Sequence, residues 1–136
     1  MERKLRYGQI GGTLGAFIGG VHRKAIALNE QAELVAGCFS ATNPDNNRKC
    51  AAHYGIAPER TYDNYLAMAD AEAAITEDRL DFIVICTPNR FHYEEAKAFL
   101  ERGFNIVCEK PLCFTVEQAE ELCALAKAKD VLFCVT

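Results

Sequence analysis

Lys110 is the side chain of this sequence best placed for proton transfer. It stands between Glu109 and Pro111, directly after the apolar run Asn105–Cys108. Partial burial at the rim of a strand lowers the pKa of a lysine toward the pH at which an enzyme works. Pro111 prevents further regular strand pairing and so keeps the ammonium group at the rim. The alternative interpretation is an ordinary surface ion pair between Glu109 and the lysine.

A second polar group follows the apolar run Phe82–Cys86. It comprises Thr87, Pro88, Asn89 and His92. Hydroxyl, amide and imidazole groups at this place can bind a polar ligand, and an imidazole can also exchange a proton near neutral pH. The simpler interpretation is a helix start, because Thr and Asn cap helices and Pro fixes φ, with a packed imidazole behind it. The residues alone leave both interpretations open.

The third candidate is a glycine-rich segment with six glycines between Gly8 and Gly20. Read from Gly11, it matches the dinucleotide fingerprint G-x-G-x-x-G/A at Gly11 and at Ala16, but Thr13 occupies the middle position. That middle glycine normally lets the backbone approach the pyrophosphate of the cofactor. The segment therefore indicates a dinucleotide site only weakly, and glycines that merely serve a strand-to-helix turn are the alternative.

These residues need a sheet to bring them together, and the sequence predicts one. Strands are predicted over Leu5–Ile10, Glu33–Phe39, Phe82–Cys86, Asn105–Cys108 and Val131–Val135. All but the first are nearly continuous in apolar residues, which is typical of parallel strands covered on both faces. With helices between them, we expect an α/β fold: a doubly wound parallel sheet, Rossmann-like, in three αβα layers with right-handed crossovers.

Helix starts are visible between the strands. Asn43 followed by Pro44 predicts an N-cap with proline at the first helical position, and the sequence TVEQ at 115–118 has capping-box spacing. Another helix is predicted from about Asp63 to Ala73, whereas the link from Glu72 to Asp81 fits no single pattern. The first helix, from about Gly15 to Leu28, should lie against the sheet through one apolar face, made of Phe17, Val21, Ala25 and Leu28.

The end of the second strand bears on the choice of dinucleotide, because ligands of such sheets bind beyond the carboxyl ends of the strands. A carboxylate there accepts hydrogen bonds from the ribose 2′-hydroxyl of NAD, but this sequence has Ser40. The nearest acid is Asp45, in the following helix, and Arg48 and Lys49 are close behind it. Without a carboxylate to repel a 2′-phosphate, NADP is expected to be at least as acceptable as NAD.

Composition excludes several other functions. The 15 Lys and Arg residues are scattered and outnumbered by 19 Asp and Glu, for a net charge of -4, so we expect no nucleic-acid binding. Apolar runs such as Phe82–Cys86 are far shorter than the roughly 18 residues of a membrane span. The charged stretch Met1–Arg6 has no apolar signal region, which favours the cytoplasm. The length fits one domain, residues 1–136.

The seven cysteines are expected to be buried, reduced thiols rather than ligands or disulfides. Four of them lie within apolar strand-like runs: Cys38, Cys86, Cys108 and Cys134. The number is odd, and no C-x-x-C spacing is present. We therefore expect no metal site.

Taken together, three segments resemble the N-terminal nucleotide-binding domain of the Gfo/Idh/MocA oxidoreductase family, which includes glucose-fructose oxidoreductase and inositol dehydrogenase. They are GGTLGAFIGGVHR at 11–23, ICTPNRFHYEEAKAFLERGFNIVCEKPL at 85–112 and LFCVT at 132–136. The resemblance covers essentially the whole chain. The joint occurrence of T-P-N-x-x-H and E-K-P is far more specific than the glycines.

The resemblance implies a site for NAD or NADP built at four strand ends. The pyrophosphate turn would consist of Gly11, Gly12, Thr13, Leu14 and Gly15, with the backbone amides from Thr13 to Ala16 facing phosphate. The adenosine ribose would face Ser40, and the middle of the cofactor would be lined by Thr87, Pro88, Asn89 and His92. Glu109 and Pro111 would frame Lys110 beside the nicotinamide and the substrate hydroxyl, where it assists proton transfer during hydride exchange.

The family continues into a second α/β domain, which supplies the substrate pocket, usually a D-x-x-x-H motif, and much of the oligomer contact. No D-x-x-x-H spacing occurs in these residues. We therefore expect the chain to be the cofactor half of a dehydrogenase for a sugar, polyol or related hydroxy compound, inactive by itself. A homo-oligomeric complete protein is possible, and its state is left open.

Two other functions fit the same residues. One is a nucleotide-binding regulatory or interaction module that keeps the fold without catalysis. The other is a remnant that binds no cofactor because Thr13 blocks the turn. The effect of a Lys110 replacement on turnover distinguishes the regulatory or interaction module from a dehydrogenase. Titration with NADH and NADPH tests the remnant, which should bind neither.

Overall fold

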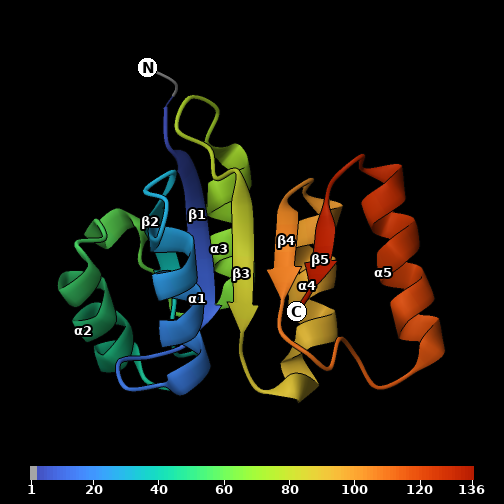
Figure 1. The fold of residues 1–136 in the computed structure, drawn as a ribbon, viewed down its shortest axis with the longest axis horizontal. Helices are drawn as coiled ribbons and strands as arrows, with labels where there is room; N and C mark the ends of the chain where they lie inside the picture. The colour runs from blue at the N-terminus through green and yellow to red at the C-terminus, as the bar shows by residue number, and fades with distance from the viewer. Residues whose placement is uncertain (1–2) are drawn as a thin grey trace.

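The computed structural model describes residues 3–136 and is an α/β fold with helices packed on a central sheet (Figure 1). The strands are β1 (Leu5–Gly11), β2 (Ala32–Cys38), β3 (Phe82–Cys86), β4 (Asn105–Cys108) and β5 (Phe133–Val135). The helices are α1 (Phe17–Ala27), α2 (Pro44–Tyr54), α3 (Tyr65–Ala74), α4 (His92–Glu101) and α5 (Val116–Ala128), with short 3-10 helices η1 (Pro58–Arg60) and η2 (Asn89–Phe91). No helix in this part of the chain is long and apolar enough to cross a membrane.

The sheet has the strand order β2-β1-β3-β4-β5, and every neighbouring pair is parallel. The chain begins in β1, moves outward to β2 and then returns past β1 to build the other half from β3 onward. Helix α1 lies on the near face in Figure 1, whereas α3 and α4 lie behind the sheet. This confirms the predicted doubly wound, Rossmann-like fold. The point between β1 and β3 where the order reverses is where such sheets bind ligands.

The apolar runs of the sequence are explained by burial on both faces of the central strands. Ile83, Val84 and Ile85 of β3 all have no exposed surface. Ile83 and Ile85 belong to a cluster that includes Phe99 of α4, whereas Val84 packs in a separate cluster beneath Ile18 of α1. Side chains alternate across a strand, so a strand covered on both faces must be apolar at every position.

The prediction for the inward face of α1 is wrong. Phe17 and Leu28 are 83% and 86% exposed, and Val21 also faces outward. The face that meets the sheet carries Ile18 and Ile26 instead. The helix has two apolar stripes, and periodicity alone cannot choose between them. A close contact between the buried Gly19 and the glycine-rich turn, described below, decides the rotation.

The two helix caps predicted at Asn43 and Thr115 are confirmed. Asn43 Oδ1 accepts a hydrogen bond from Asn46 N at 3.1 Å, and Pro44 is the first residue of α2. At α5, Thr115 Oγ1 accepts from Gln118 N at 3.2 Å, and Gln118 Oε1 accepts from Phe114 N at 3.0 Å. The contacts to Asn46 N and Gln118 N satisfy backbone amides that the first helical turn leaves without partners.

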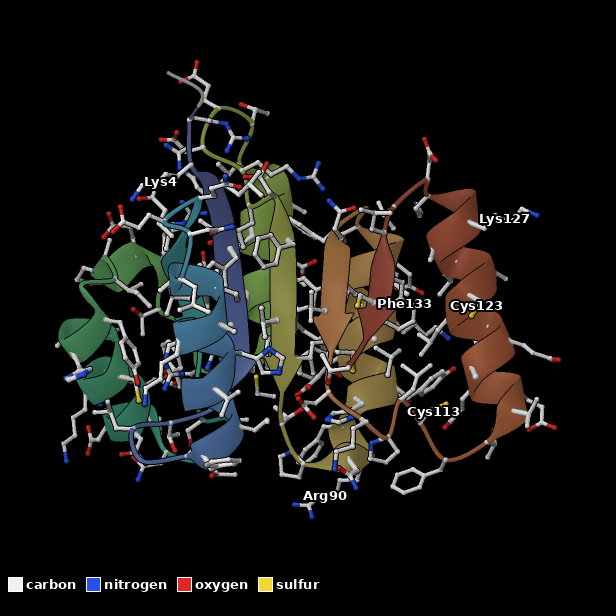
Figure 2. All side chains as sticks on the ribbon, in the orientation of Figure 1. Lys4, Arg90, Cys113, Cys123, Lys127 and Phe133 are labelled. Atoms are coloured by element: carbon white, nitrogen blue, oxygen red, sulfur yellow. The ribbon has the colours of Figure 1, made fainter. Side chains whose placement is uncertain are left out.

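The prediction of buried cysteines is confirmed at three of the four strand positions and is wrong at Cys134. Cys38, Cys86 and Cys108 are buried, but Cys134 of β5 is exposed, as is Cys123, which projects from α5 (Figure 2). All seven are free thiols. β2 and β5 are both edge strands, but Cys38 of β2 belongs to the buried cluster around Phe99, whereas in β5 it is the neighbouring Phe133 that packs against that cluster.

Candidate dinucleotide-binding site

The polar residues singled out in the sequence all follow carboxyl ends of parallel strands. The register pairs Ile10 with Cys38, Gly11 with Cys86 and Ile85 with Cys108, so β1 to β4 end at the same edge. The loops after β1, β3 and β4 lie together at the lower edge in Figure 1. Segments more than 70 positions apart in the sequence therefore meet at one place, which confirms that the strand ends form one surface.

The glycine-rich segment forms a turn that only glycine adopts easily. Gly11, Gly12 and Gly15 have φ angles of +75°, +69° and +84°. A Cβ on Gly12 would come within 2.9 Å of the Cα of Gly19 in α1, so these two glycines allow helix and turn to touch. The fingerprint places this close-packing role at its third glycine, which the sequence assigned to Ala16. In the structure Gly19 performs it.

Two of the four backbone amides expected to face phosphate already donate hydrogen bonds within the protein. Leu14 N donates to Cys50 Sγ at 3.3 Å, and Ala16 N donates to Thr13 O at 2.9 Å. Within residues 3–136, the amides of Thr13 and Gly15 make no hydrogen bond. A Cβ placed on Gly15 would meet nothing within 4 Å. The turn thus has open space and free donors beside the N-terminus of α1, which fits an anionic pyrophosphate.

Two residues that the sequence analysis missed hold the turn from behind. Gln9 Nε2 donates to Gly11 O at 3.0 Å, and Arg23 Nη1 donates to Gly12 O at 3.0 Å. Gln9 has no exposed surface, and the Arg23 guanidinium also lies 4.4 Å above the ring centre of Tyr54. By binding the carbonyl oxygens, both side chains fix the orientation of the turn. The available signal was a lone glutamine within an apolar strand.

At the end of β2, the loop around Ser40 is held by the fully buried Asn47. Asn47 Oδ1 accepts from Ser40 N at 2.8 Å, and its Nδ2 donates to Ser40 O at 2.6 Å. Arg48 pairs with Asp45 at 2.5 Å, but both side chains are largely exposed. Such a pair contributes little and is easily exchanged for another anion. A carboxylate that the sequence analysis did not place here lies close by, because Asn47 Nδ2 also donates to Asp63 Oδ1 at 3.2 Å.

After β3, Thr87 binds a buried carboxyl group that the sequence analysis did not identify. The Thr87 hydroxyl donates to Glu95 Oε2, and Glu95 is only 5% exposed. Burial raises the pKa of Glu95 to about 7, although the hydrogen bond from Thr87 opposes the rise. Pro88 and Asn89 are exposed at the same edge, with Asn89 opening η2. Arg90 points away from the sheet there (Figure 2).

His92 connects two loops of the site. Its Nε2 lies 2.8 Å from Thr87 O, and its Nδ1 lies 2.8 Å from Pro111 O. The side chain has no exposed surface. Both ring nitrogens are therefore engaged by carbonyl oxygens, which corresponds to the packed interpretation. His92 shapes the site from beneath and does not offer a nitrogen to a ligand.

Glu109 and Lys110 do not form the surface ion pair considered from the sequence. Glu109 is 8% exposed, and its carboxylate binds His22 and Thr136. Lys110 is exposed, so the partial burial expected from the sequence is not found. Its ammonium group makes no hydrogen bond or ion pair with residues 3–136. Its backbone is held on both sides, because Lys110 N donates to Glu109 Oε2 at 3.2 Å and Pro111 O lies 2.8 Å from His92 Nδ1. An unpaired ammonium on an anchored backbone is suited to proton exchange with a ligand.

A parallel sheet with a glycine turn at its switch point and polar strand ends defines a dinucleotide-binding domain. The family model described as "Oxidoreductase family, NAD-binding Rossmann fold" (GFO_IDH_MocA) matches residues 5–136. The chain belongs to this family, the Gfo/Idh/MocA oxidoreductases, and is its NAD-binding Rossmann domain.

Individual relatives of this chain are also named as oxidoreductases or dehydrogenases. A relative with the name "Uncharacterized oxidoreductase YfiI", from Bacillus subtilis (strain 168), is 36% identical over 137 residues, covering 100% of this chain and 34% of the relative. D-glucoside 3-dehydrogenase of Escherichia coli (strain K12) is 35% identical over 107 residues, covering 79% of this chain and 28% of the relative. The chain thus spans about a third of the length of these relatives.

Solved structures of related proteins superimpose closely on this chain. An oxidoreductase from Pseudomonas syringae has a TM-score of 0.94 at 39% identity, covering 100% of this chain and 37% of that chain. An inositol dehydrogenase homolog from Azotobacter vinelandii, complexed with NAD+, has a TM-score of 0.93 at 35% identity, covering 100% of this chain and 34% of that chain. The same homolog is also described with NADH and myo-inositol.

Proposed function

We propose that residues 1–136 are the cofactor domain of a dehydrogenase that acts on a sugar, polyol or related hydroxy compound, and that a second domain supplies its substrate pocket. The observation that carries the proposal is the exposed ammonium of Lys110 at the strand-end edge, which has no partner among residues 3–136 and stands on a backbone anchored through Glu109 and Pro111. The kinship with a D-glucoside 3-dehydrogenase and with an inositol dehydrogenase homolog bound to myo-inositol supports the substrate class.

Each strand end has a distinct role in this proposal. The free amides of Thr13 and Gly15 bind the pyrophosphate, Ser40 faces the adenosine ribose, and Thr87 and Asn89 line the middle of the cofactor. The nicotinamide supplies a hydride acceptor when the cofactor is bound. Lys110 Nζ takes the proton of the substrate hydroxyl as the C–H hydride leaves, which produces a carbonyl compound. In the reverse direction its ammonium returns the proton.

The test compares Lys110→Met with a matched control, Lys127→Met, in the complete protein. Lys127 is an exposed lysine of α5 far from the strand-end edge (Figure 2). Oxidation of myo-inositol and of a panel of glucosides and polyols is followed by the absorbance of the reduced dinucleotide. Loss of a general acid-base group lowers kcat by about 10²- to 10⁴-fold. We expect that loss for Lys110→Met, no change for the control, and nearly unchanged dinucleotide affinity in both.

Two outcomes contradict the proposal. An unchanged kcat in Lys110→Met removes the proton-transfer role. Binding of NADH without turnover of any member of the panel favours the non-catalytic regulatory or interaction module. The same titrations, made with NADH and NADPH, test whether Ser40 leaves room for a 2′-phosphate, in which case NADPH binds at least as tightly as NADH.

A further inference from the structure

His22 joins the first helix to the residue that precedes Lys110. Its Nε2 lies 2.8 Å from Glu109 Oε1, although the two residues are 87 positions apart in the sequence. The His22 and Glu109 side chains are only 12% and 10% exposed. This contact crosses from α1 to the end of β4, over the point where the strand order reverses.

Glu109 receives hydrogen bonds from several elements at once. Besides His22, Thr136 Oγ1 donates to its Oε1 at 3.0 Å, and Lys110 N donates to its Oε2 at 3.2 Å. Burial acts to raise the pKa of Glu109, but the hydrogen bonds from His22 and Thr136 outweigh it and hold the pKa below the ordinary value. The group is therefore a carboxylate at neutral pH. A carboxylate only accepts, so the Nε2 of His22 carries the hydrogen.

The Glu109 carboxylate, fixed in this way, in turn holds the backbone of Lys110. The Lys110 side chain has no partner of its own among residues 3–136, so only its backbone attachment determines where the ammonium group can reach. That attachment consists of the amide bound to Glu109 and of Pro111 on the other side. The reaction rate is sensitive to the placement of a catalytic group, because displacing the group by about 1 Å can lower the rate about 10²-fold. A residue that fixes the Glu109 carboxylate therefore affects proton transfer without contacting the substrate.

We propose that His22 is a positioning residue for Lys110, acting through the Glu109 carboxylate. This inference rests on the proposed role of Lys110 in proton transfer. His22 itself exchanges no proton with the substrate, and its donor Nε2 holds one oxygen of Glu109 while the other oxygen receives the Lys110 amide. A glutamine at position 22 can place an N–H near the position of Nε2, whereas the shorter asparagine cannot reach Glu109.

The structural part of the inference is tested on the 136-residue chain by amide hydrogen exchange. Loss of the His22 contact frees the Glu109 carboxylate to rotate toward solvent. In His22→Leu and His22→Asn we expect the Lys110 amide to exchange at least about tenfold faster than in the unaltered chain. His22→Gln should restore most of the protection. Lys24→Leu, an exposed change on the same helix, serves as the control and should alter nothing.

The catalytic part is tested in the complete protein with the substrate found for the proposed function. We expect kcat to fall about ten- to 10²-fold in His22→Asn, with KM for the dinucleotide changed less, and to recover in His22→Gln. If His22 acts only through Lys110, the double variant His22→Asn with Lys110→Met is no slower than Lys110→Met alone. A purely structural role would instead lower both backgrounds by the same factor.

The outcomes separate this inference from the proposed function. If Lys110→Met keeps full kcat, the proposed function fails, whatever His22 does. If Lys110→Met is slow but His22→Asn is not, or if the two effects multiply, the positioning role is overturned. Unchanged exchange of the Lys110 amide in both His22→Leu and His22→Asn also overturns it, and that measurement needs no substrate. His22→Asn keeps a polar side chain, so the test survives if His22→Leu does not fold.

Discussion

Replacing Glu95 by glutamine should make the folded chain more stable above neutral pH and should remove a pH dependence of its unfolding. Burial raises the pKa of Glu95 from 4.5 to about 7, because the charged form loses its hydration at a site that is 5% exposed. Between these pH values the folded protein binds a proton that the unfolded chain has released. Stability from this group is therefore full below the unfolded pKa and is lost as pH rises through about 7.

The size of the effect follows from the same shift. One pKa unit corresponds to about 1.4 kcal/mol, so full ionisation of Glu95 costs the folded state on the order of 3 kcal/mol. Glutamine has nearly the same shape, carries no charge and still offers an oxygen to the Thr87 hydroxyl, which donates to Glu95. We expect the variant to be about 1 kcal/mol more stable than the unaltered chain at pH 5 and about 3 kcal/mol more stable at pH 8.5.

Urea unfolding of both chains from pH 5 to pH 8.5 measures this difference directly. The other titratable groups are common to both chains, so their contributions cancel in the comparison. Burial raises the pKa values of the neighbouring thiols Cys38 and Cys108 to about 12, so they stay protonated throughout. Parallel stability profiles for the two chains would refute the reasoning, because they would mean that Glu95 stays charged in the folded state without cost.

The two remaining predictions concern the glycine-rich turn. Thr13→Gly should bind NADH about two- to tenfold more tightly by calorimetry, because the backbone can then approach the pyrophosphate, while the added chain entropy lowers stability by roughly 0.5 to 1 kcal/mol; equal or weaker binding would show that Thr13 does not crowd the cofactor. Gly19→Ala should destabilise the chain by about 1 to 3 kcal/mol in the same urea assay, because its Cβ would lie 2.6 Å from the Cα of Gly12. Gly20→Ala, whose Cβ meets only a flexible arginine end at 3.9 Å, is the matched control, and equal effects of the two would contradict the packing argument.

The features that depend on neighbouring residues were determined by the sequence itself. The apolar runs predicted β3 and β4 with the observed bounds, and the caps at Asn43 and Thr115 form as their spacing indicates. Parallel strands end at a common edge, so the positions of the glycine turn, T-P-N-x-x-H and E-K-P immediately after strands already predicted one site. These patterns act within a few residues, and a sequence displays them directly.

Contacts between distant segments were decided only by the tertiary structure. Both stripes of α1 are apolar in the sequence, and the approach of Gly19 to Gly12 turned the predicted stripe outward. The same rotation brings His22 to Glu109, so that the carboxylate expected beside Lys110 instead binds a helix 87 positions away. Gln9, Asn47 and Glu95 acquire their roles in the same way, from burial against partners on other elements. Such contacts depend on how the crossovers pack the helices on the sheet, and no local pattern of residues encodes that packing.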